Sequence, residues 1–395
     1  MSLLARLAGP WRAVPILGLT QIIAWGALFY PPVLTVPLIA AERGWSLTFA
    51  MSGFSFGLLV GGFVAPGVGG LIDRYGGHRV MPMGSLLGAL GLIALTQATD
   101  PLAYLAVWAL LGAAMAASLY DPAFATLGRI FGAQARRPIT MLTFIGGFAS
   151  TVSWPTTYFL LAAYGWRGTY LVYAALLALI AAPLHAFLLP RERDDPKGRT
   201  AGPLAPQKVI PAKGWAFLVV AAAFAAYAFV PSALSAHMLA IFGRLGLEPG
   251  MVIAIGALFG PAQVTARLAE FMFAGKVHPI MIARFAVGLL LAAFALLAAL
   301  GVSIYAAAAF AILFGLTNGL ITVARGTVPL TLFGTVGYGR VVGRIASPSL
   351  LMQAAAPLVI AFVAERVSDP AALATVAGIA AISFAGFVAM CRPRA

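Results

Sequence analysis

Four charged residues interrupt long apolar stretches of this sequence, and their chemistry gives the first indication of function. Asp121 lies in SLYDPAF, Arg267 and Glu270 lie in QVTARLAEF, and Arg325 lies in NGLITVARGTVP. Carboxylates and guanidinium groups pair with one another, bind ions or carry protons. A charge at the centre of a membrane-spanning helix costs at least about 2.5 kcal/mol. Each of the four therefore needs either a partner or a task.

Arg267 and Glu270 are three residues apart and so share one face of a helix, with Gln263 one turn earlier. Two interpretations of this polar stripe stay open. The two charges neutralise each other as a structural pair, or Arg267 binds an anionic group of a substrate while Glu270 carries a coupling proton. Burial disfavours the charged form of a carboxylate, which helps it to exchange a proton near neutral pH.

Softer candidates for a cavity lining are polar and aromatic residues near proline breaks, where membrane proteins open backbone groups to a cavity. They are Gln21, Trp25, Trp154, Tyr158, Tyr227 and Asn318. Tryptophan and tyrosine also anchor helices at the membrane surface, so packing is the alternative for each aromatic residue. His237 lies near the outer end of its apolar stretch, and we expect it to contact water rather than relay protons.

The composition indicates that the elements carrying these residues lie in a membrane. Of the 395 residues, 62% are hydrophobic and 9% are charged, whereas soluble domains carry about 25% charged residues. Such a chain cannot cover its surface in water. Its only cysteine, Cys391, excludes an internal disulfide and any cysteine-based metal site. We expect no metal and no cofactor.

Twelve apolar stretches are long enough to cross about 30 Å of hydrocarbon as helices. They cover residues 13–40, 47–71, 80–98, 102–128, 138–163, 168–189, 214–243, 250–274, 279–300, 303–325, 338–363 and 371–390. The charged, proline-rich segment RERDDPKGRTAGPLAPQKVIPAK divides them six and six. The sequence therefore predicts an all-α membrane protein with an N-terminal bundle (1–190), a cytoplasmic linker (191–213) and a C-terminal bundle (214–395).

The positive charges predict the orientation of the chain. If both termini are cytoplasmic, eighteen of the 25 Lys and Arg residues lie on the cytoplasmic side and four on the other. This is the usual bias of membrane proteins, and it accounts for the net charge of +14. A nucleic-acid partner is not expected, because the basic residues do not cluster on a soluble domain.

Weak internal similarity predicts that the two bundles are repeats. RIFG (129–132) matches TLFG (331–334), and Pro155 matches Pro357, both at an offset of 202 residues. GGFVAP (61–66) matches GALFGP (256–261) at an offset of 195, and LLG (110–112) matches LFG (313–315) at 203. Parallel repeats of this kind build transporters with a binding site near the membrane midplane.

The repeat places Asp121 and Arg325 at almost the same depth in equivalent helices of opposite bundles, since an offset of 202 or 203 maps Asp121 onto Val323 or Ala324. We expect this pair to meet across the cytoplasmic mouth when that mouth closes, and to separate when the bundles rock apart. The alternative is that each charge is satisfied within its own bundle, for example Asp121 by Arg129.

The turn between the second and third spans carries the most specific motif, GGLIDRYGGHR at 69–79. It resembles the loop between helices two and three of the major facilitator superfamily, written roughly G-x-x-x-D-R-x-G-R-R. The matching residues are Gly70, Asp73, Arg74, Gly77 and Arg79. The second-half copy, AGKVHPIMIAR at 274–284, keeps scattered basic residues and no Asp.

The resemblance implies a gate at this turn. Glycines allow close helix approach, and Asp73 would accept backbone N–H groups at the start of the eleventh helix, near Tyr338. Such a contact would hold the two halves together on the cytoplasmic side in one state and release them in another. The alternative is that the charges only fix the topology.

The sequence lacks the motifs of other classes of membrane protein. No G-x-x-x-x-G-K-[ST] occurs, which argues against an ATP-driven pump. Four histidines give no convincing Ser-His-Asp set, so an enzyme is not expected. A passive channel would favour an oligomeric ring, whereas an internal repeat predicts a monomer. The G-x-x-x-G-P pattern of many drug exporters is not clean in the fifth span.

We therefore predict a secondary active transporter in a bacterial cytoplasmic membrane. It moves a small organic solute by alternating access and is coupled to protons. The embedded arginines favour an organic anion such as a carboxylate. The chain also resembles monocarboxylate-like carriers and exporters of toxicants or arsenicals. Proton-driven efflux of a drug, arsenical or other toxic compound is the alternative function.

Overall fold

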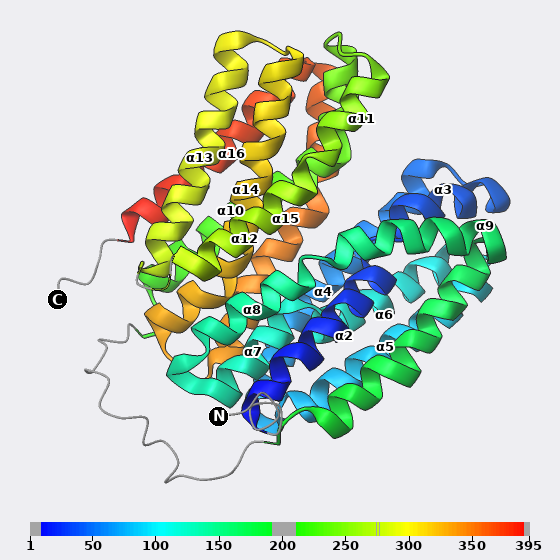
Figure 1. The fold of residues 1–395 in the computed structure, drawn as a ribbon. Coiled ribbons are helices and arrows are strands. Elements are labelled where there is room, and N and C mark those ends of the chain that lie inside the picture. Colours follow the sequence, from blue (N-terminus) through cyan, green and yellow to red (C-terminus); the bar gives the residue numbers. More distant parts are fainter. Residues whose placement is uncertain (1–8, 192–210, 274, 276, 391–395) are drawn as a thin grey trace.

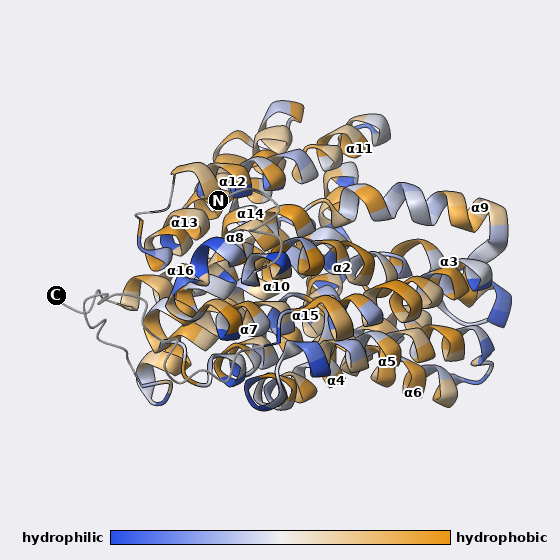
Figure 2. Ribbon diagram, turned by 60° about the horizontal axis from the view of Figure 1, so that its bottom comes forward, coloured by the Kyte–Doolittle hydropathy of each residue, from blue (hydrophilic) through white to orange (hydrophobic). Residues whose placement is uncertain are grey.

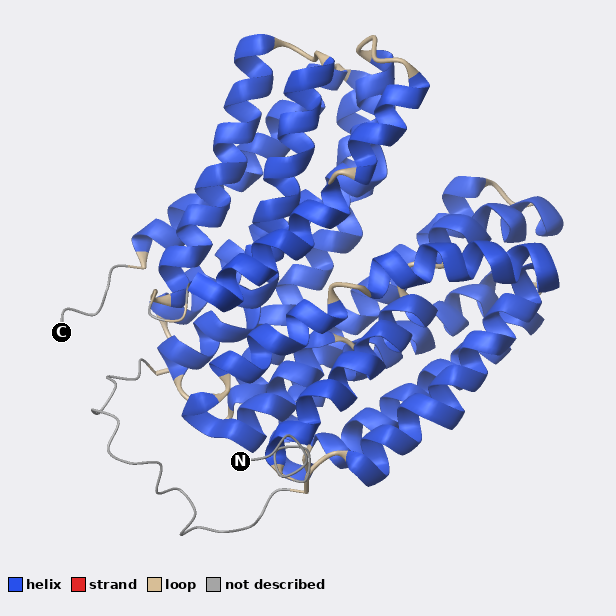
Figure 3. Cartoon of the chain, viewed as in Figure 1, coloured by secondary structure: helices blue, strands red, loops and turns tan. Residues whose placement is uncertain are grey.

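The described part of the chain is folded into helices, without any strand (Figures 1 and 3). The structure, a computed structural model, describes residues 9–191, 211–273, 275 and 277–390. Most of the predicted linker (192–210) and Cys391 lie outside the described residues.

Two groups of helices lie side by side (Figure 1). The first group consists of η1 (Pro10–Arg12), α2 (Ala13–Leu28), α3 (Pro32–Arg43), α4 (Leu47–Tyr75), α5 (Gly77–Gln97), α6 (Pro101–Ser118), α7 (Tyr120–Phe131), η2 (Gly132–Gln134), α8 (Arg136–Gly146), α9 (Ala149–Leu176), η3 (Leu177–Ala181) and η4 (Leu184–Leu188). The second group consists of α10 (Trp215–Arg244), α11 (Pro249–Ala257), α12 (Phe259–Phe273), α13 (Pro279–Leu300), α14 (Ile304–Phe333), α15 (Tyr338–Arg366) and α16 (Asp369–Ala389).

Within the described chain, eleven helical stretches are long and apolar enough to cross a membrane. The longest, Arg136–Leu188, has 53 residues and contains both the fifth and the sixth predicted spans. Gly165 divides it with φ of 64°, a left-handed conformation that favours glycine. This merged stretch accounts for the difference between the twelve predicted spans and the eleven stretches.

Large apolar side chains on the outside of the bundle also indicate a membrane environment. Leu102, Phe187 and Trp215 are each more than three-quarters exposed. Hydrophobic residues run along α5 and α9, and hydrophilic residues gather mainly near helix ends (Figure 2). A surface of this kind would aggregate in water and is stable against lipid tails, so the chain is a multi-pass membrane protein.

The first predicted span is interrupted between α2 and α3, and three further predicted spans are broken near the middle of the molecule. The fourth breaks at Leu119, because Pro122 cannot donate to the Ser118 carbonyl four residues earlier and its ring crowds that carbonyl. Pro261 has the same relation to Ala257, where α11 ends. The fifth breaks at Gly147 and Phe148, between α8 and α9. Each break frees backbone groups that a side chain or ligand can bind.

The two groups contact each other most closely through α4, α7 and α8 of the first and α12, α14 and α15 of the second. Glycines bring α4 and α15 together: a side chain at Gly69 would strike the backbone of Gly339, and one at Gly343 would strike Ala65. Gly128 of α7 leaves room for the Tyr338 ring at the start of α15. The groups are therefore in direct backbone contact at the end where α4 ends and α15 begins.

Two ion pairs at the opposite end agree with the predicted repeat. Glu42 pairs with Arg167 at 2.6 Å, and Arg244 pairs with Asp369 at 2.6 Å. Positions 42 and 244, like positions 167 and 369, are 202 residues apart, which is the predicted offset. The first pair joins α3 to α9, and the second joins α10 to α16, so each lies within its own group. The two pairs carry opposite signs at equivalent positions.

A glycine on α6 gives a test of the close packing of α6 against α4. Replacing Gly112 with Ala would place a methyl group against the backbone of Gly57 on α4, where neither backbone can yield cheaply. Gly112→Ala should therefore lower the stability of the folded protein by about 1–3 kcal/mol. Thermal unfolding of the purified protein measures the loss. The matched control is Gly67→Ala on α4, which meets open space and should be neutral or slightly stabilising. Equal unfolding temperatures for the two variants would contradict the packing argument.

Candidate functional site

The Asp73 carboxylate binds the start of α15. Its Oδ1 accepts the N–H of Gly339 at 2.8 Å, and its Oδ2 accepts the N–H of Arg340 at 2.7 Å. These N–H groups belong to the first helical turn, which has no intrahelical acceptor for them and carries the positive end of the helix dipole. We call this contact the latch, and the end of the molecule that holds it the latch end.

The other motif residues surround the latch. Gly70 lies 3.5 Å from the Arg340 side chain, as measured from the position of a Cβ, and Gly77 leaves room for Thr126 of α7. The Arg74 guanidinium lies 5.0 Å from the centre of the Tyr75 ring. Arg79 is exposed on the first turn of α5. The motif thus supplies one cross-group contact through Asp73 and small residues that allow it.

Arg129 of α7 supports the latch from within the first group. Its guanidinium donates to the backbone carbonyl of Ile72 at 3.0 Å and also to the carbonyl of Asp73. A cation at the C-terminus of α4 is favourable, since the last carbonyls of a helix lack partners there. This interaction fixes the turn that carries Asp73. Sequence reasoning considered Arg129 only as a partner for Asp121.

Asp121 and Arg325 are in direct contact across the two groups. Arg325 Nη2 lies 2.7 Å from Asp121 Oδ2, and both side chains are about four-fifths buried. Asp121 lies in the first turn of α7, directly after the break at Leu119, and Arg325 lies on α14. The ion pair therefore joins α7 of the first group to α14 of the second.

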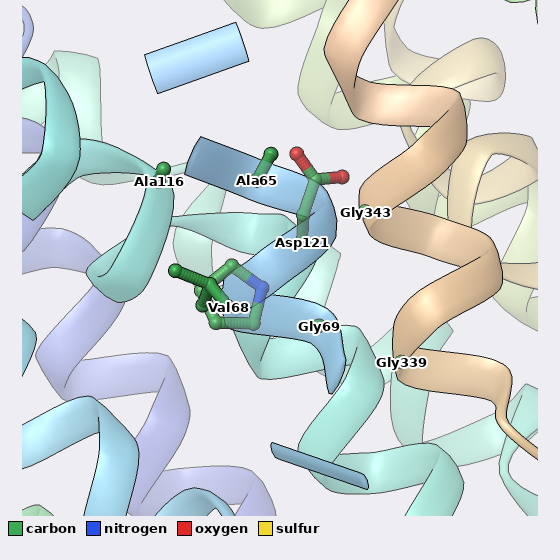
Figure 4. Close-up of a pocket in the computed structure, with 8 residues that line it drawn as sticks. Ala65, Val68, Gly69, Ala116, Asp121, Gly339 and Gly343 are labelled. Atoms are coloured by element: carbon green, nitrogen blue, oxygen red, sulfur yellow. The ribbon is translucent and has the colours of Figure 1, made fainter. Parts of the chain in front are cut away.

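A cavity lies directly against this ion pair. Its walls are mainly apolar and come from both groups, including Trp25, Phe29, Met115 and Leu350, while Tyr120, Asp121, Arg325 and Gln353 supply the polar groups. A second, smaller pocket lies on the other side of Asp121, between α4 and α15 (Figure 4). The combination of an apolar wall and a few convergent polar groups is typical of a small-molecule site.

Arg267 of α12 is buried, with 3% of its surface exposed, and has no carboxylate partner among the described residues. Its Nη1 donates to the Thr143 carbonyl at 3.1 Å, and its Nη2 lies 3.4 Å from the Thr322 hydroxyl. Thr143 is in the last turn of α8, so the guanidinium faces the negative end of that helix dipole. Gly147 leaves the space that the guanidinium occupies.

Tyrosines surround this guanidinium. Tyr120, which lines the cavity, lies beside it, and Tyr30 and Tyr227 are close enough to interact with its charge. The Arg267 Nε is buried without a hydrogen-bond partner in the described chain. The site therefore holds a positive charge that hydroxyls and carbonyls solvate only in part.

Glu270 contacts the first group rather than Arg267. Its Oε1 lies 3.6 Å from Arg136 Nη2 at the start of α8, and Thr140 lies within hydrogen-bonding reach. Its other oxygen is buried without a partner in the described chain. The structure thus does not bring Arg267 and Glu270 together as an ion pair, although their spacing favours one, because α8 approaches α12 between them. Glu270 as the proton carrier stays a prediction.

Two pairs of the softer candidates form polar contacts in the middle of the molecule. Gln21 Nε2 donates to the Ser118 carbonyl freed by Pro122 at 2.8 Å, and its Oε1 accepts from Trp25 Nε1 at 3.1 Å. Tyr227 Oη donates to Asn318 Oδ1 at 3.3 Å. Gln21 thus orients Trp25, which lines the cavity, and also donates to the carbonyl that the helix break leaves without a partner.

The other soft candidates do not line either cavity. Trp154 lies 6.1 Å from Tyr30, between ring centres, and Tyr158 is 65% exposed. The Gln263 backbone packs against Gly319 of α14. His237 Nε2 lies 2.8 Å from the Pro357 carbonyl, so this ring joins α10 to α15. Substrate roles for Trp154, Tyr158 and Gln263 stay predictions.

Residues 16–285 match the sequence profile of the Major Facilitator Superfamily. The chain belongs to this superfamily. This assignment agrees with the motif at 69–79 and makes the protein a membrane transporter rather than an enzyme.

Relatives in the superfamily are similar over part or all of the chain. Human Monocarboxylate transporter 11 is 32% identical over 137 residues, which is 34% of this chain and 29% of that protein. The chain thus matches less than a third of that relative's length.

Solved structures of superfamily members show the same fold. The human organic anion transporter MFSD10 (TETRAN) has a TM-score of 0.72 at 18% identity, over 95% of this chain and 99% of that one. The E. coli Fucose:proton symporter FucP (N162A) has a TM-score of 0.74 at 12% identity, over 96% and 98%. FucP in its outward conformation has a TM-score of 0.69 at 11% identity, over 96% and 98%.

The latch gives a direct prediction. Asp73→Asn removes the charge and one acceptor from the start of α15, which should weaken closure by about 1–2 kcal/mol, or about 5–30-fold in population. Spin labels at Tyr75→Cys and Val336→Cys, two exposed positions at the latch end, measure this opening as a longer distance after Cys391 is replaced by Ser.

The matched control is Asp100→Asn, which removes the charge of a helix-capping carboxylate within the first group at the opposite end. This control should leave the distance distribution unchanged. A distribution for Asp73→Asn that equals that of the unmutated protein would show that the latch does not hold the groups together.

Proposed function

We propose that this transporter is a secondary active carrier of a small organic anion, and that Arg267 binds the carboxylate of that anion. The observation that carries the proposal is the buried Arg267 guanidinium, which has no carboxylate partner in the described chain and keeps an unpaired Nε–H. Arginine recognises carboxylates through paired N–H donors, which makes it well suited to this role.

The energetics of a buried charge support this assignment. An uncompensated cation in a low-dielectric site is costly, and the helix dipole and two threonines around Arg267 supply only partial compensation. An anionic substrate would complete the compensation. Arg267 is not itself a lining residue of the cavity, but Tyr120 lies beside it and lines the cavity. Tyr120 and the apolar cavity wall would therefore contact the organic part of the substrate, which favours a small, partly apolar monocarboxylate. The partial sequence likeness to Monocarboxylate transporter 11 agrees with this substrate class.

The carrier would work by alternating access with the latch end in the cytoplasm. Eighteen of the 25 basic residues fall on that side in the predicted topology, which supports cytoplasmic termini. Closure at the latch end by Asp73 and by the Asp121–Arg325 pair would correspond to an outward-facing state. Opening would require both contacts to break. Coupling to protons and location in a bacterial inner membrane complete the proposal.

A binding screen tests the substrate class. Purified protein is heated with lactate, pyruvate or benzoate, with the neutral amides of these acids, with arsenite, and with the cationic drug ethidium. A bound ligand stabilises the folded state by about 2.7 kcal/mol at a concentration of a hundred times its Kd. We expect a carboxylate to raise the unfolding temperature and its amide to leave it unchanged. A response to arsenite or ethidium alone would favour the efflux alternative.

A variant of Arg267 tests the residue. Arg267→Gln should weaken binding of the responding acid by about 10–150-fold, because a charge-assisted hydrogen bond contributes about 1.5–3 kcal/mol. Arg267→Lys should retain part of the affinity, since the charge remains. Titration calorimetry measures both constants. The control, Arg244→Gln, removes an arginine that pairs with Asp369 at the opposite end. Undiminished binding by Arg267→Gln would reject the assignment.

A further inference from the structure

The two oxygens of Asp121 have different surroundings. Oδ2 binds Arg325 at 2.7 Å, whereas Oδ1 is buried without a hydrogen-bond partner in the described chain. A carboxylate oxygen in this position loses its hydration without a replacement donor. A proton on Asp121 would remove the charge that needs this hydration. The ion pair therefore leaves one oxygen of the carboxyl group available for a proton.

Asp121 also lines both cavities described above, and it is the one titratable residue that does so, since the other shared lining residue is Ala116. The larger cavity reaches it on the side of Trp25, Arg325 and Gln353. The smaller pocket has about 10 Å³ of space, close to the minimum that holds one water molecule. This pocket lies between the carboxyl group, Ala65 of α4, and Gly339 and Gly343 of α15 (Figure 4). Water from the larger cavity thus has a route to Asp121, and a single water fits between Asp121 and the latch.

The groups that face Asp121 determine whether its charged or its neutral form is more stable. Arg325 from α14 and the N-terminus of α7 favour the charged form. Tyr338 from α15 and the neighbouring Tyr120 are the other titratable groups close to it. The pocket residues of α4 and α6 (Ala65, Val68, Gly69 and Ala116) have no titratable side chain. The charge state of Asp121 is therefore governed by Arg325, which belongs to the other group of helices.

We propose that Asp121 binds the coupling proton, and that its protonation releases the latch end by removing the attraction between α7 and α14. The inference rests on the proposed proton-coupled carrier and names the residue that couples the proton to the gate. The proton comes from water in the larger cavity and adds to a carboxylate oxygen. Arg325 keeps its charge and is left without its partner, so the contact between the groups weakens.

Glu270 is the competing candidate. Like Asp121, it pairs with an arginine of the other group and has one buried oxygen without a partner in the described chain, but it differs in its access to the cavities. Its carboxylate pairs with Arg136 on α8 and lines neither cavity. A proton from the larger cavity has no route to Glu270 through the described pockets. Glu270 is better placed to hold the start of α8 against α12, as Asp73 holds the start of α15 against α4.

The experiment uses protons as the only probe, so it needs no substrate. The labelled protein, with Tyr75→Cys, Val336→Cys and Cys391→Ser, is reconstituted in lipid nanodiscs, and distances are measured between about pH 8 and about pH 5. We expect the long-distance population to rise as the pH falls, by at most tenfold per pH unit, the limit for one bound proton. A distribution that does not change with pH would overturn the proposal.

Variants identify the residue. Asp121→Asn should show a raised long-distance population that is independent of pH, and Asp121→Glu should restore the pH dependence and also control for folding. Asp369→Asn, at the opposite end, should respond like the parent protein. A full pH response in Asp121→Asn, or its loss in Glu270→Gln but not in Asp121→Asn, would overturn the proposal.

The outcome is separable from the substrate proposal. If no carboxylate binds but the distances respond to pH through Asp121, the proposed anion is wrong and the proton site stands. If a carboxylate binds through Arg267 and Asp121→Asn keeps the pH response, the substrate class stands and the proton site is wrong.

Discussion

The absence of water within the membrane is the constraint on which this structure depends. A charge at that depth is stable only beside an opposite charge or an aligned set of dipoles. Asp121 meets this condition through Arg325, and Glu270 through Arg136. These buried ion pairs thus join the two groups of helices, and Arg267 alone among these residues is compensated by dipoles.

Backbone geometry makes this compensation possible. Pro122 and Pro261 interrupt helices near the centre, and Gly147 follows the end of α8. The freed groups are then used: Gln21 binds the Ser118 carbonyl, and Arg267 binds the Thr143 carbonyl. Close glycine contacts between α4 and α15 bring Asp73 within reach of the N–H groups at the start of α15. The site is thus built from helix ends, and the side chains around it bind the backbone groups that these ends expose.

Much of the fold follows from the sequence, because bilayer thickness sets a minimum length for each spanning helix. This length can be recognised in the sequence as a run of apolar residues. The depth of Asp121 and Arg325 follows from the repeat, and the structure places these residues in contact. The Glu270–Arg136 contact was not predicted, because spacing along one helix favours Arg267 and gives no information about the approach of α8. The break at Leu119 has a local signal in Pro122, which our assignment of a continuous span at 102–128 overlooked.

The reversed signs of the two outer ion pairs have an evolutionary consequence. If the halves arose by duplication, equivalent positions began with the same residue. Glu42 with Arg167 and Arg244 with Asp369 can then have been reached, one substitution at a time, only through a form that lacked the ion pair. Such a form was tolerable because both arginines are about half exposed and ion pairs of this kind contribute only about 0–1 kcal/mol. Buried pairs such as Asp121–Arg325 offered no comparable neutral route.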